Sequence, residues 1–279
     1  MKIGIVSHAR DVWGEEGYKK LAELGYSAID FDIICSNNPV FTLSDEEVEK
    51  YLDHQKELAA EAGVMFSQVH GPWQFPPRDG TEEERAERMD KMKKSIAACA
   101  RIGCKYWVIH PIMPFGCENP EGTDEEYLDL NFKFMRELLE YAKGFGVTIC
   151  LENMPFKKQP LAKPAEILDF VQKMNDDNFK ICLDTGHVSV FNDIDIAEEV
   201  RRLGKEIKVL HVHDNNGKQD NHFAPYFGVI KWAEFGQALK DIGFDGVISL
   251  ETVPSKKLPP KLYEEMCGTY CKMAKSIVE

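Results

Sequence analysis

Histidines and carboxylates are concentrated in residues 210–222, which read LHVHDNNGKQDNH. The three histidines are His211, His213 and His222, and the two aspartates are Asp214 and Asp220. Imidazole nitrogens and carboxylate oxygens bind divalent metals and move protons near neutral pH. A polar surface loop with incidental histidines explains any one of these residues alone, so the rest of the chain must decide between the two interpretations.

Residues of the same types end five short apolar runs elsewhere in the chain. They are His70, His110, Glu152, Asp184 and Glu251. Short apolar runs of this kind are typical of buried strands. A single polar residue after a strand often caps the next helix. Six successive runs that carry such residues, counting the one with His211, favour a single shared site instead.

The composition is typical of a globular chain without an extended basic surface. The chain has 279 residues, 43% of them hydrophobic, and a formal net charge of −13. We find no linker-like or low-complexity segment, so we expect one domain over residues 1–279. The acidic balance argues against a broad nucleic-acid-binding or membrane-binding surface. The short apolar N-terminus and the eight scattered cysteines, which include no CxxC pair, predict a cytoplasmic protein.

Glycines and capping motifs divide the chain into repeating units. Four glycines follow charged, helix-periodic segments and precede apolar runs, as glycines at helix C-termini do: Gly25, Gly63, Gly103 and Gly146. Three expected helix starts carry a glutamate three residues later, which is the spacing of a capping box: Ser44, Thr81 and Thr123. The apolar runs predict strands at residues 2–7, 28–33, 64–70, 106–110, 147–152, 179–184, 208–213 and 247–251.

Eight strand–helix units predict an α/β fold, a (β/α)8 TIM barrel. Strict alternation implies parallel strands joined by right-handed crossovers, and eight units in this length match such a barrel. A doubly wound open sheet is the alternative, but the sequence has neither a GxGxxG loop nor a Walker A motif. In a parallel barrel the C-terminal ends of the strands meet at one mouth. The polar residues that end the expected strands should therefore converge there.

The ligand types leave the number of metal ions open. Glu152, Asp184, His211 and Glu251 would form an oxygen-rich site suited to Mn²⁺, Mg²⁺ or Co²⁺, with Zn²⁺ tolerated. Five further residues would supply enough nitrogen for two or three zinc ions: His70, His110, His187, Asp220 and His222. The sequence permits both arrangements.

Four motifs in order give the chain a resemblance to a known superfamily. They are LEN at 151–153, CLDTGH at 182–187, HVHDNNGKQDNH at 211–222 and SLE at 249–251. With this order and spacing, the whole chain resembles the xylose isomerase-like TIM-barrel superfamily. That superfamily includes ketose 3-epimerases, sugar-phosphate isomerases, inosose dehydratases and endonuclease IV.

The resemblance to ketose epimerases implies specific roles. Residues that match Glu152, Asp184, His211 and Glu251 bind one divalent metal there, the two glutamates double as the acid/base pair, and the match to His187 contacts substrate oxygens. The resemblance thus makes His211 a direct ligand and leaves indirect roles to His213 and Asp214. One departure concerns the arginine that those epimerases carry six residues after the histidine ligand, because this chain has Gly217 there, followed by Lys218.

The favoured function is a metal-dependent sugar isomerase or epimerase. It would act on a small sugar or polyol, without a phosphate, by proton transfer through an enediolate. The expected substrate contacts are His70, His110, His187, Asp220, His222 and Trp73. The Trp73 ring would stack on a sugar face, although plain loop packing explains it equally well.

Three rival functions share the same residues. An endonuclease IV-like enzyme with three zinc ions finds all nine of its ligand positions here, but the expected mouth loops lack the clustered Lys and Arg that bind phosphates. An inosose dehydratase-like lyase would use the same site. A non-enzymatic barrel with a structural metal is disfavoured, since a structural site gains little from two extra carboxylates. The outer helices of such barrels commonly pair, so a homo-oligomer is compatible with the sequence.

Overall fold

The computed structural model describes residues 1–117 and 122–279, in which strands and helices alternate. The strands are β1 (Lys2–Val6), β2 (Ala28–Asp32), β3 (Met65–His70), β4 (Tyr106–Ile109), β5 (Thr148–Glu152), β6 (Phe179–Asp184), β7 (Ile207–His211) and β8 (Val247–Leu250). The α-helices are α1 (Gly17–Glu23), α2 (Pro39–Thr42), α3 (Asp45–Glu61), α4 (Glu82–Arg101), α5 (Asp124–Lys143), α6 (Pro164–Met174), α7 (Thr185–Ser189), α8 (Ile196–Leu203), α9 (Trp232–Asp241) and α10 (Pro260–Ser276). Two 3-10 helices are η1 (Ser7–Glu16) and η2 (Gly204–Glu206). Among the described residues, no helix has both the length and the apolar composition needed to cross a bilayer.

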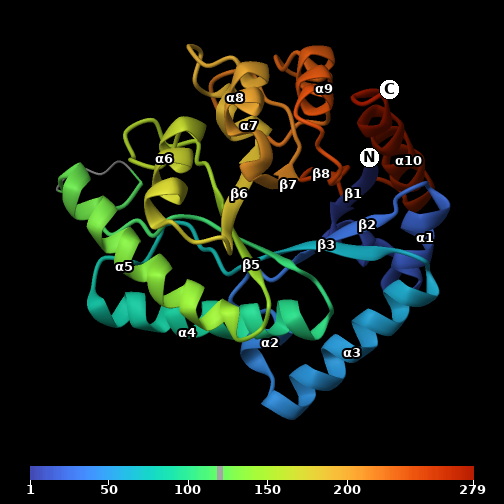
Figure 1. Cartoon of the computed structure of the whole chain (residues 1–279). Helices are drawn as coiled ribbons and strands as arrows, with labels where there is room; N and C mark the ends of the chain where they lie inside the picture. Colours follow the sequence, from blue (N-terminus) through green and yellow to red (C-terminus); the bar gives the residue numbers. More distant parts are fainter. Residues whose placement is uncertain (118–121) are drawn as a thin grey trace.

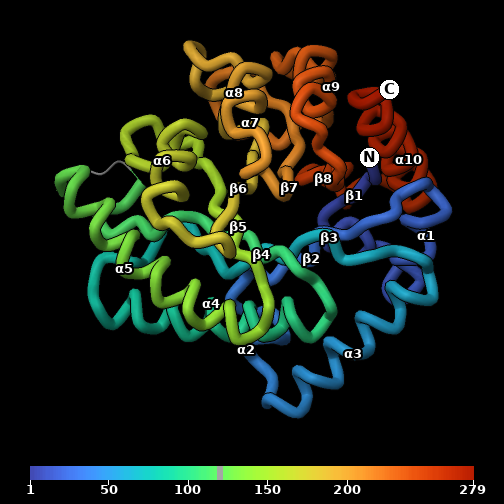
Figure 2. The backbone as a smooth tube through the Cα atoms, in the orientation of Figure 1, coloured from blue at the N-terminus to red at the C-terminus, as the bar shows by residue number. Residues whose placement is uncertain are grey.

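The strands form one parallel sheet that closes on itself. Their order is β7-β6-β5-β4-β3-β2-β1-β8, and each named pair is parallel. The seam between β7 and β8 is bridged at Val212, whose N–H donates to Ser249 O at 2.8 Å and whose carbonyl accepts from Glu251 N at 3.1 Å. The helices lie around the outside of the strands (Figures 1 and 2). The predicted TIM barrel is therefore confirmed, and the open-sheet alternative is wrong.

Local signals in the sequence set the ends of the helices. The helices α3, α4 and α5 begin at the three expected capping boxes, at Ser44, Thr81 and Thr123. The four expected C-terminal glycines all have positive φ values, between 64° and 99°. A residue with a side chain is strained in that conformation. The ends of these helices are therefore set by capping residues and glycines that lie within a few residues of each end.

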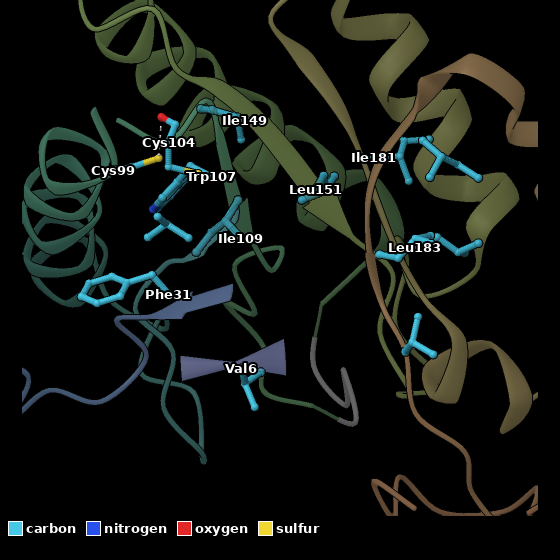
Figure 3. Close-up of a cluster of buried hydrophobic side chains, with 14 of the residues drawn as sticks. Val6, Phe31, Cys99, Cys104, Trp107, Ile109, Ile149, Leu151, Ile181 and Leu183 are labelled. Atoms are coloured by element: carbon cyan, nitrogen blue, oxygen red, sulfur yellow. Dashed lines mark hydrogen bonds between the residues drawn. The ribbon is translucent and has the colours of Figure 1, made fainter. Parts of the chain in front are cut away.

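Alternation along the strands separates two apolar layers. Leu151 and Leu183 point outward into the large core between strands and helices (Figure 3). Four residues of the opposite parity form a separate buried cluster inside the barrel: Val108, Cys150, Cys182 and Val209. Two residues further along the same four strands, towards their C-terminal ends, come His110, Glu152, Asp184 and His211. Since side chains two apart share a face, this apolar plug is the floor beneath the polar residues.

The capping box of α4 allows a direct test of this local control. The Thr81 side chain accepts a hydrogen bond from Glu84 N at 3.1 Å. We expect Thr81→Ala to lower the free energy of unfolding by about 1 kcal/mol, because a helix N–H loses its partner. Urea denaturation followed by circular dichroism measures the change.

Thr269→Ala is the matched control, since Thr269 is exposed within α10 and bonds only its own helix backbone, at Glu265 O. Its replacement should be neutral or slightly stabilising, because alanine has the higher helix propensity. Equal losses in both variants would contradict a capping role for Thr81.

Candidate functional site

Glu152 is the centre of the polar layer at the barrel mouth. Its carboxylate is fully buried, at 0% exposure. Ring nitrogens of four histidines lie close to it: His211 Nδ1 at 3.0 Å, His110 Nε2 at 3.2 Å, and His70 Nε2 and His187 Nδ1 both at 3.5 Å. His70 and His211 end β3 and β7, His110 directly follows β4, and His187 lies in α7, which follows β6. The barrel thus brings together residues that are far apart in the sequence around one carboxylate.

A second group of residues continues from this centre over β6, β7 and the following loop. His213 Nε2 lies 3.0 Å from Asp184 Oδ2 and 3.6 Å from Asp220 Oδ1. Asp220 Oδ2 lies 3.3 Å from His187 Nε2 and 3.2 Å from His222 Nε2. The rings of His213 and His222 stack with centroids 4.1 Å apart. The two groups are continuous through His187.

Several buried polar atoms of the site have no hydrogen-bond partner. They include both Glu152 carboxylate oxygens, His70 Nε2, His110 Nδ1, His211 Nδ1, His213 Nδ1 and Glu251 Oε2. His211 Nδ1 lies 3.0 Å from Glu152 Oε1 and 3.6 Å from Glu251 Oε2. Buried polar groups are normally paired, and such a nitrogen and these oxygens are compatible only with a proton or a cation between them. The residues present therefore fit a divalent metal.

Hydrogen bonds on the far side of each ring fix its orientation. His211 Nε2 donates to Asp30 Oδ2 at 2.9 Å, which leaves Nδ1 directed at Glu152. Asp30 Oδ2 also accepts from Gln68 Nε2 at 3.1 Å. His70 Nδ1 lies 2.8 Å from the carbonyl of Gly71. Partners of this kind orient metal-binding histidines and set which nitrogen is free.

Asp30 and Gln68 are site residues that the sequence analysis missed. Both are buried, with exposures of 1% and 0%. The available signal was strand parity, because Asp30 is two residues before Asp32 in β2 and Gln68 is two residues before His70 in β3. Polar residues at inward positions of an otherwise apolar strand need partners inside the barrel. That requirement identifies Asp30 and Gln68 as residues with partners inside the barrel, but it does not show which residues they contact.

The environment shifts the ionisation of several groups. Burial raises the pKa of Glu152, but His211 and His110 outweigh it and hold that pKa well below its usual value. Burial outweighs the opposing influence of Glu152 and, with His70 and His187, lowers the pKa of His110 to about 4, so this ring is neutral near pH 7 and keeps a lone pair. Burial raises the pKa of Glu251, against the influence of His211. Perturbed groups of this kind cluster at functional sites.

The remaining expected contacts lie at the rim. Glu251 has a side-chain exposure of 14% and lines a cavity together with His70 and His222. His222 is directed into the site rather than away from it, since its Nδ1 lies 2.8 Å from the carbonyl of Glu251. Trp73 is half-buried, and its ring meets the His110 ring edge to face with centroids 4.8 Å apart. All the residues expected at the site thus lie at the mouth.

The stretch 210–222 contributes residues in two different ways. His211 and His213 are both buried and both face the site, as their parity predicts. Asp214 is buried as well but turns away from Glu152 and the histidines around it. Its carboxylate accepts the backbone N–H groups of Gly228, Val229 and Ile230 and the indole N–H of Trp232, at 2.9–3.2 Å. Asp214 therefore holds the end of the loop that carries Asp220 and His222.

Comparison with known proteins identifies the family. The family model described as xylose isomerase-like TIM barrel matches residues 18–271. The chain belongs to this family. This xylose isomerase-like barrel is also similar over its full length to a solved D-tagatose 3-epimerase-like protein, with 30% identity and a TM-score of 0.78, and it covers 98% of that chain.

Curated relatives of this xylose isomerase-like barrel fall into more than one functional class. A D-psicose 3-epimerase from Ruminiclostridium cellulolyticum is 28% identical over 262 residues, which cover 90% of this chain and 83% of the relative. A probable endonuclease 4 from Mycoplasmopsis synoviae is 29% identical over 218 residues, which cover 73% and 74%. The two classes that the sequence left as rivals are therefore both represented at similar identity.

The loop held by Asp214 generates a testable prediction. In Asp214→Asn the amide nitrogen cannot accept, so either the backbone N–H of Gly228 or that of its neighbours loses a partner, and the loop end loosens. We expect the free energy of unfolding to fall by about 2 kcal/mol, in line with hydrogen bonds to a charged group. Urea unfolding followed by tryptophan fluorescence reports this, since Trp232 is itself a partner.

Asp241→Asn is the control for a lost aspartate charge. Asp241 lies at the surface and pairs with Arg201 at 2.9 Å, and exposed ion pairs contribute about 0–1 kcal/mol. If Asp214→Asn were no more destabilising than Asp241→Asn, the anchoring role would be wrong.

Proposed function

We propose that this chain is a divalent-metal-dependent isomerase or epimerase of a small sugar or polyol. The observation that carries the proposal is the convergence of unpaired atoms of Glu152, His211 and Glu251 beside a cavity at the barrel mouth. The epimerases among its relatives support the same class of reaction. The donor set is of the kind that binds a hard or borderline divalent cation.

Glu152, Asp184, His211 and Glu251 are the residues that we propose to hold the metal. Asp184 is fully buried, and its pKa is lowered to about 2 because His187 and His213 outweigh the effect of burial. It is thus available as an anionic ligand. When bound, a divalent cation polarises a carbonyl and its neighbouring hydroxyl and so acidifies the C–H bond between them.

Glu152 and Glu251 are proposed to exchange the proton of that C–H bond. They come from β5 and β8, and both carboxylates approach the same nitrogen, His211 Nδ1. One of the two groups, as the carboxylate, takes the proton, and the bonding electrons delocalise into the carbonyl as an enediolate. The other group, as the protonated carboxylic acid, returns a proton, so the two groups exchange protonation states. Return to the opposite face of the same carbon gives epimerisation. Return to the neighbouring carbon, with the hydroxyl proton passing to the former carbonyl oxygen, gives isomerisation.

The other polar residues at the mouth are proposed to bind and orient the substrate. His187 and His222 both contact Asp220, so the three form a connected set of donors and acceptors for sugar hydroxyls. His70 and His110 flank Glu152 from β3 and β4. Trp73, which packs on His110, offers an aromatic face at the rim.

A nuclease related to endonuclease IV is the second candidate. The specific observation in its favour is that His70 and His110 with Glu152, and Asp220 and His222 with His213, form further groups with metal-binding spacing. The charge of the chain, −13, argues against it, because phosphate contacts supply much of the affinity for duplex DNA. Salt-dependent binding and cleavage of an abasic duplex would support the nuclease.

A lyase that uses the same proton abstraction is distinguished by loss of water from the substrate.

One prediction of the proposed function concerns the metal. Purified protein should carry, or take up, a divalent cation, and Asp184→Ala should lose most of it because one anionic ligand is gone. Elemental analysis after gel filtration measures both. Asp90→Ala, at an exposed position of α4, is the control and should retain the wild-type metal content. Equal metal content in all three proteins would overturn the assignment.

Another prediction of the proposed function concerns the proton on the carbon beside the substrate carbonyl. During turnover in deuterated water, label should enter the substrate at the carbon beside the carbonyl. Glu152→Gln and Glu251→Gln should each lower turnover by about 10²–10⁴-fold, the usual contribution of an acid–base group, while Glu57→Gln on the exposed face of α3 should not. Mass spectrometry and NMR give label and rate. Full activity in either site variant with metal still bound would refute the proton-transfer roles.

A further inference from the structure

A cavity of about 320 Å³ extends the site towards the first two strands of the barrel. Part of its lining is the site already described, namely His70, His222 and Glu251. Another part comes from the start of η1, directly after β1, and from the end of β2, where His8 and Asp32 line it. Its volume falls at the lower end of the about 300–1,000 Å³ range of small-molecule sites. A substrate that reacts at Glu251 therefore has room to extend along His8 and Asp32.

Asp32 is held in a fixed position at this wall. Its Oδ1 accepts the backbone N–H of Ile34 at 2.8 Å, and its own backbone N–H donates to Ser7 Oγ at 3.0 Å. Its Oδ2 lies 3.3 Å from His8 Nδ1. The Asp32 side chain remains 21% exposed and that of His8 40%. Since a carboxylate has about four acceptor positions, Asp32 retains acceptor capacity towards the cavity.

The charge of the lining selects against anionic substrates. Among the described residues that line the cavity, none is Lys or Arg, whereas Asp30, Asp32 and Glu251 contribute carboxyl groups. A phosphate or carboxylate on the substrate would find no Lys or Arg here, and His222, whose raised pKa favours the imidazolium form, is already paired with Asp220 at 3.2 Å. The carboxyl groups of the lining would repel such an anion. A hydroxyl group, by contrast, donates to a carboxylate and accepts from an imidazole N–H.

We infer that Asp32 and His8 form a distal subsite that binds the hydroxyl groups remote from the reacting carbon, so the enzyme selects longer, uncharged polyhydroxy substrates. The inference rests on the proposed function and adds the substrate class to it. Asp32 anchors the turn after β2 in any case, through Ile34. A variant of Asp32 must therefore change substrate selectivity or polyol affinity, because a loss of stability alone would reflect only its role in the turn.

The first experiment compares ketoses of different length. Asp32→Asn keeps an oxygen that can accept the Ile34 N–H but removes the charge. We expect the ratio of kcat/KM for a six-carbon ketose to that for a four-carbon ketose to fall about 10- to 100-fold, mainly through KM, as for a lost hydrogen bond to a charged group. His8→Ala should lower the same ratio. An unchanged ratio in both variants overturns the inference.

Asp11→Asn is the matched control, because Asp11 lies in η1 close to His8 in the chain but pairs with Lys256 at the surface. It should leave the ratio unchanged. A ketose phosphate that binds more tightly than the free ketose would contradict the selection of uncharged substrates.

The second experiment does not need turnover. Calorimetric titration with a hexitol, which has no carbonyl to react, should show binding to metal-loaded wild-type protein and about 10- to 100-fold weaker binding to Asp32→Asn. If no ketose is turned over, the proposed function fails, yet this titration still tests the subsite. Equal hexitol affinity in both proteins, or none in the wild type, overturns the inference.

Discussion

A single buried carboxylate imposes the main constraint on this structure. Glu152 lies at 0% exposure among four imidazole rings. Removing a carboxylate from water is costly unless a positive charge compensates it. His70, His187 and His211, whose pKa values are raised, supply that charge as imidazolium groups, or retain their lone pairs when a cation supplies it. Either way, the arrangement requires rings that are oriented from behind, and this requirement explains why Asp30 and Gln68 are buried with them.

The strands and helices of the fold were largely predictable because their signals are local. All eight expected strands were found, with ends that differ by at most two residues from the structure. Capping boxes and terminal glycines act within a few residues, so the sequence contains their whole cause. The main difference is at β7, which ends at His211, whereas the sequence predicted a strand as far as residue 213. There the chain leaves the regular ladder, because Val212 bridges to β8 and Asp214 turns outward to receive the loop.

The site was predictable as a set of residues but not as a set of contacts. Strand ends and ligand types indicated which side chains meet at the mouth. They did not indicate that Asp30, 181 residues away in the sequence, orients His211. Nor did they show that Asp184 contacts His187 and His213, or that a cavity opens towards β1 and β2. Such contacts depend on strand register and on loop conformation, which the sequence of one element does not contain.

The anchoring of one loop by Asp214 has an evolutionary consequence. Residues 215–227 leave and rejoin the barrel within reach of the same carboxylate, and Asp214 also pairs with Phe223 through both backbone hydrogen bonds at 2.8 Å. The segment that presents Asp220 and His222 is therefore closed on itself, and its two ends are fixed independently of its length. Insertions or deletions inside it should be tolerated without refolding of the barrel. A descendant could thus acquire a new substrate by exchanging this segment as a module while the carboxylates and imidazoles beneath it stay in place.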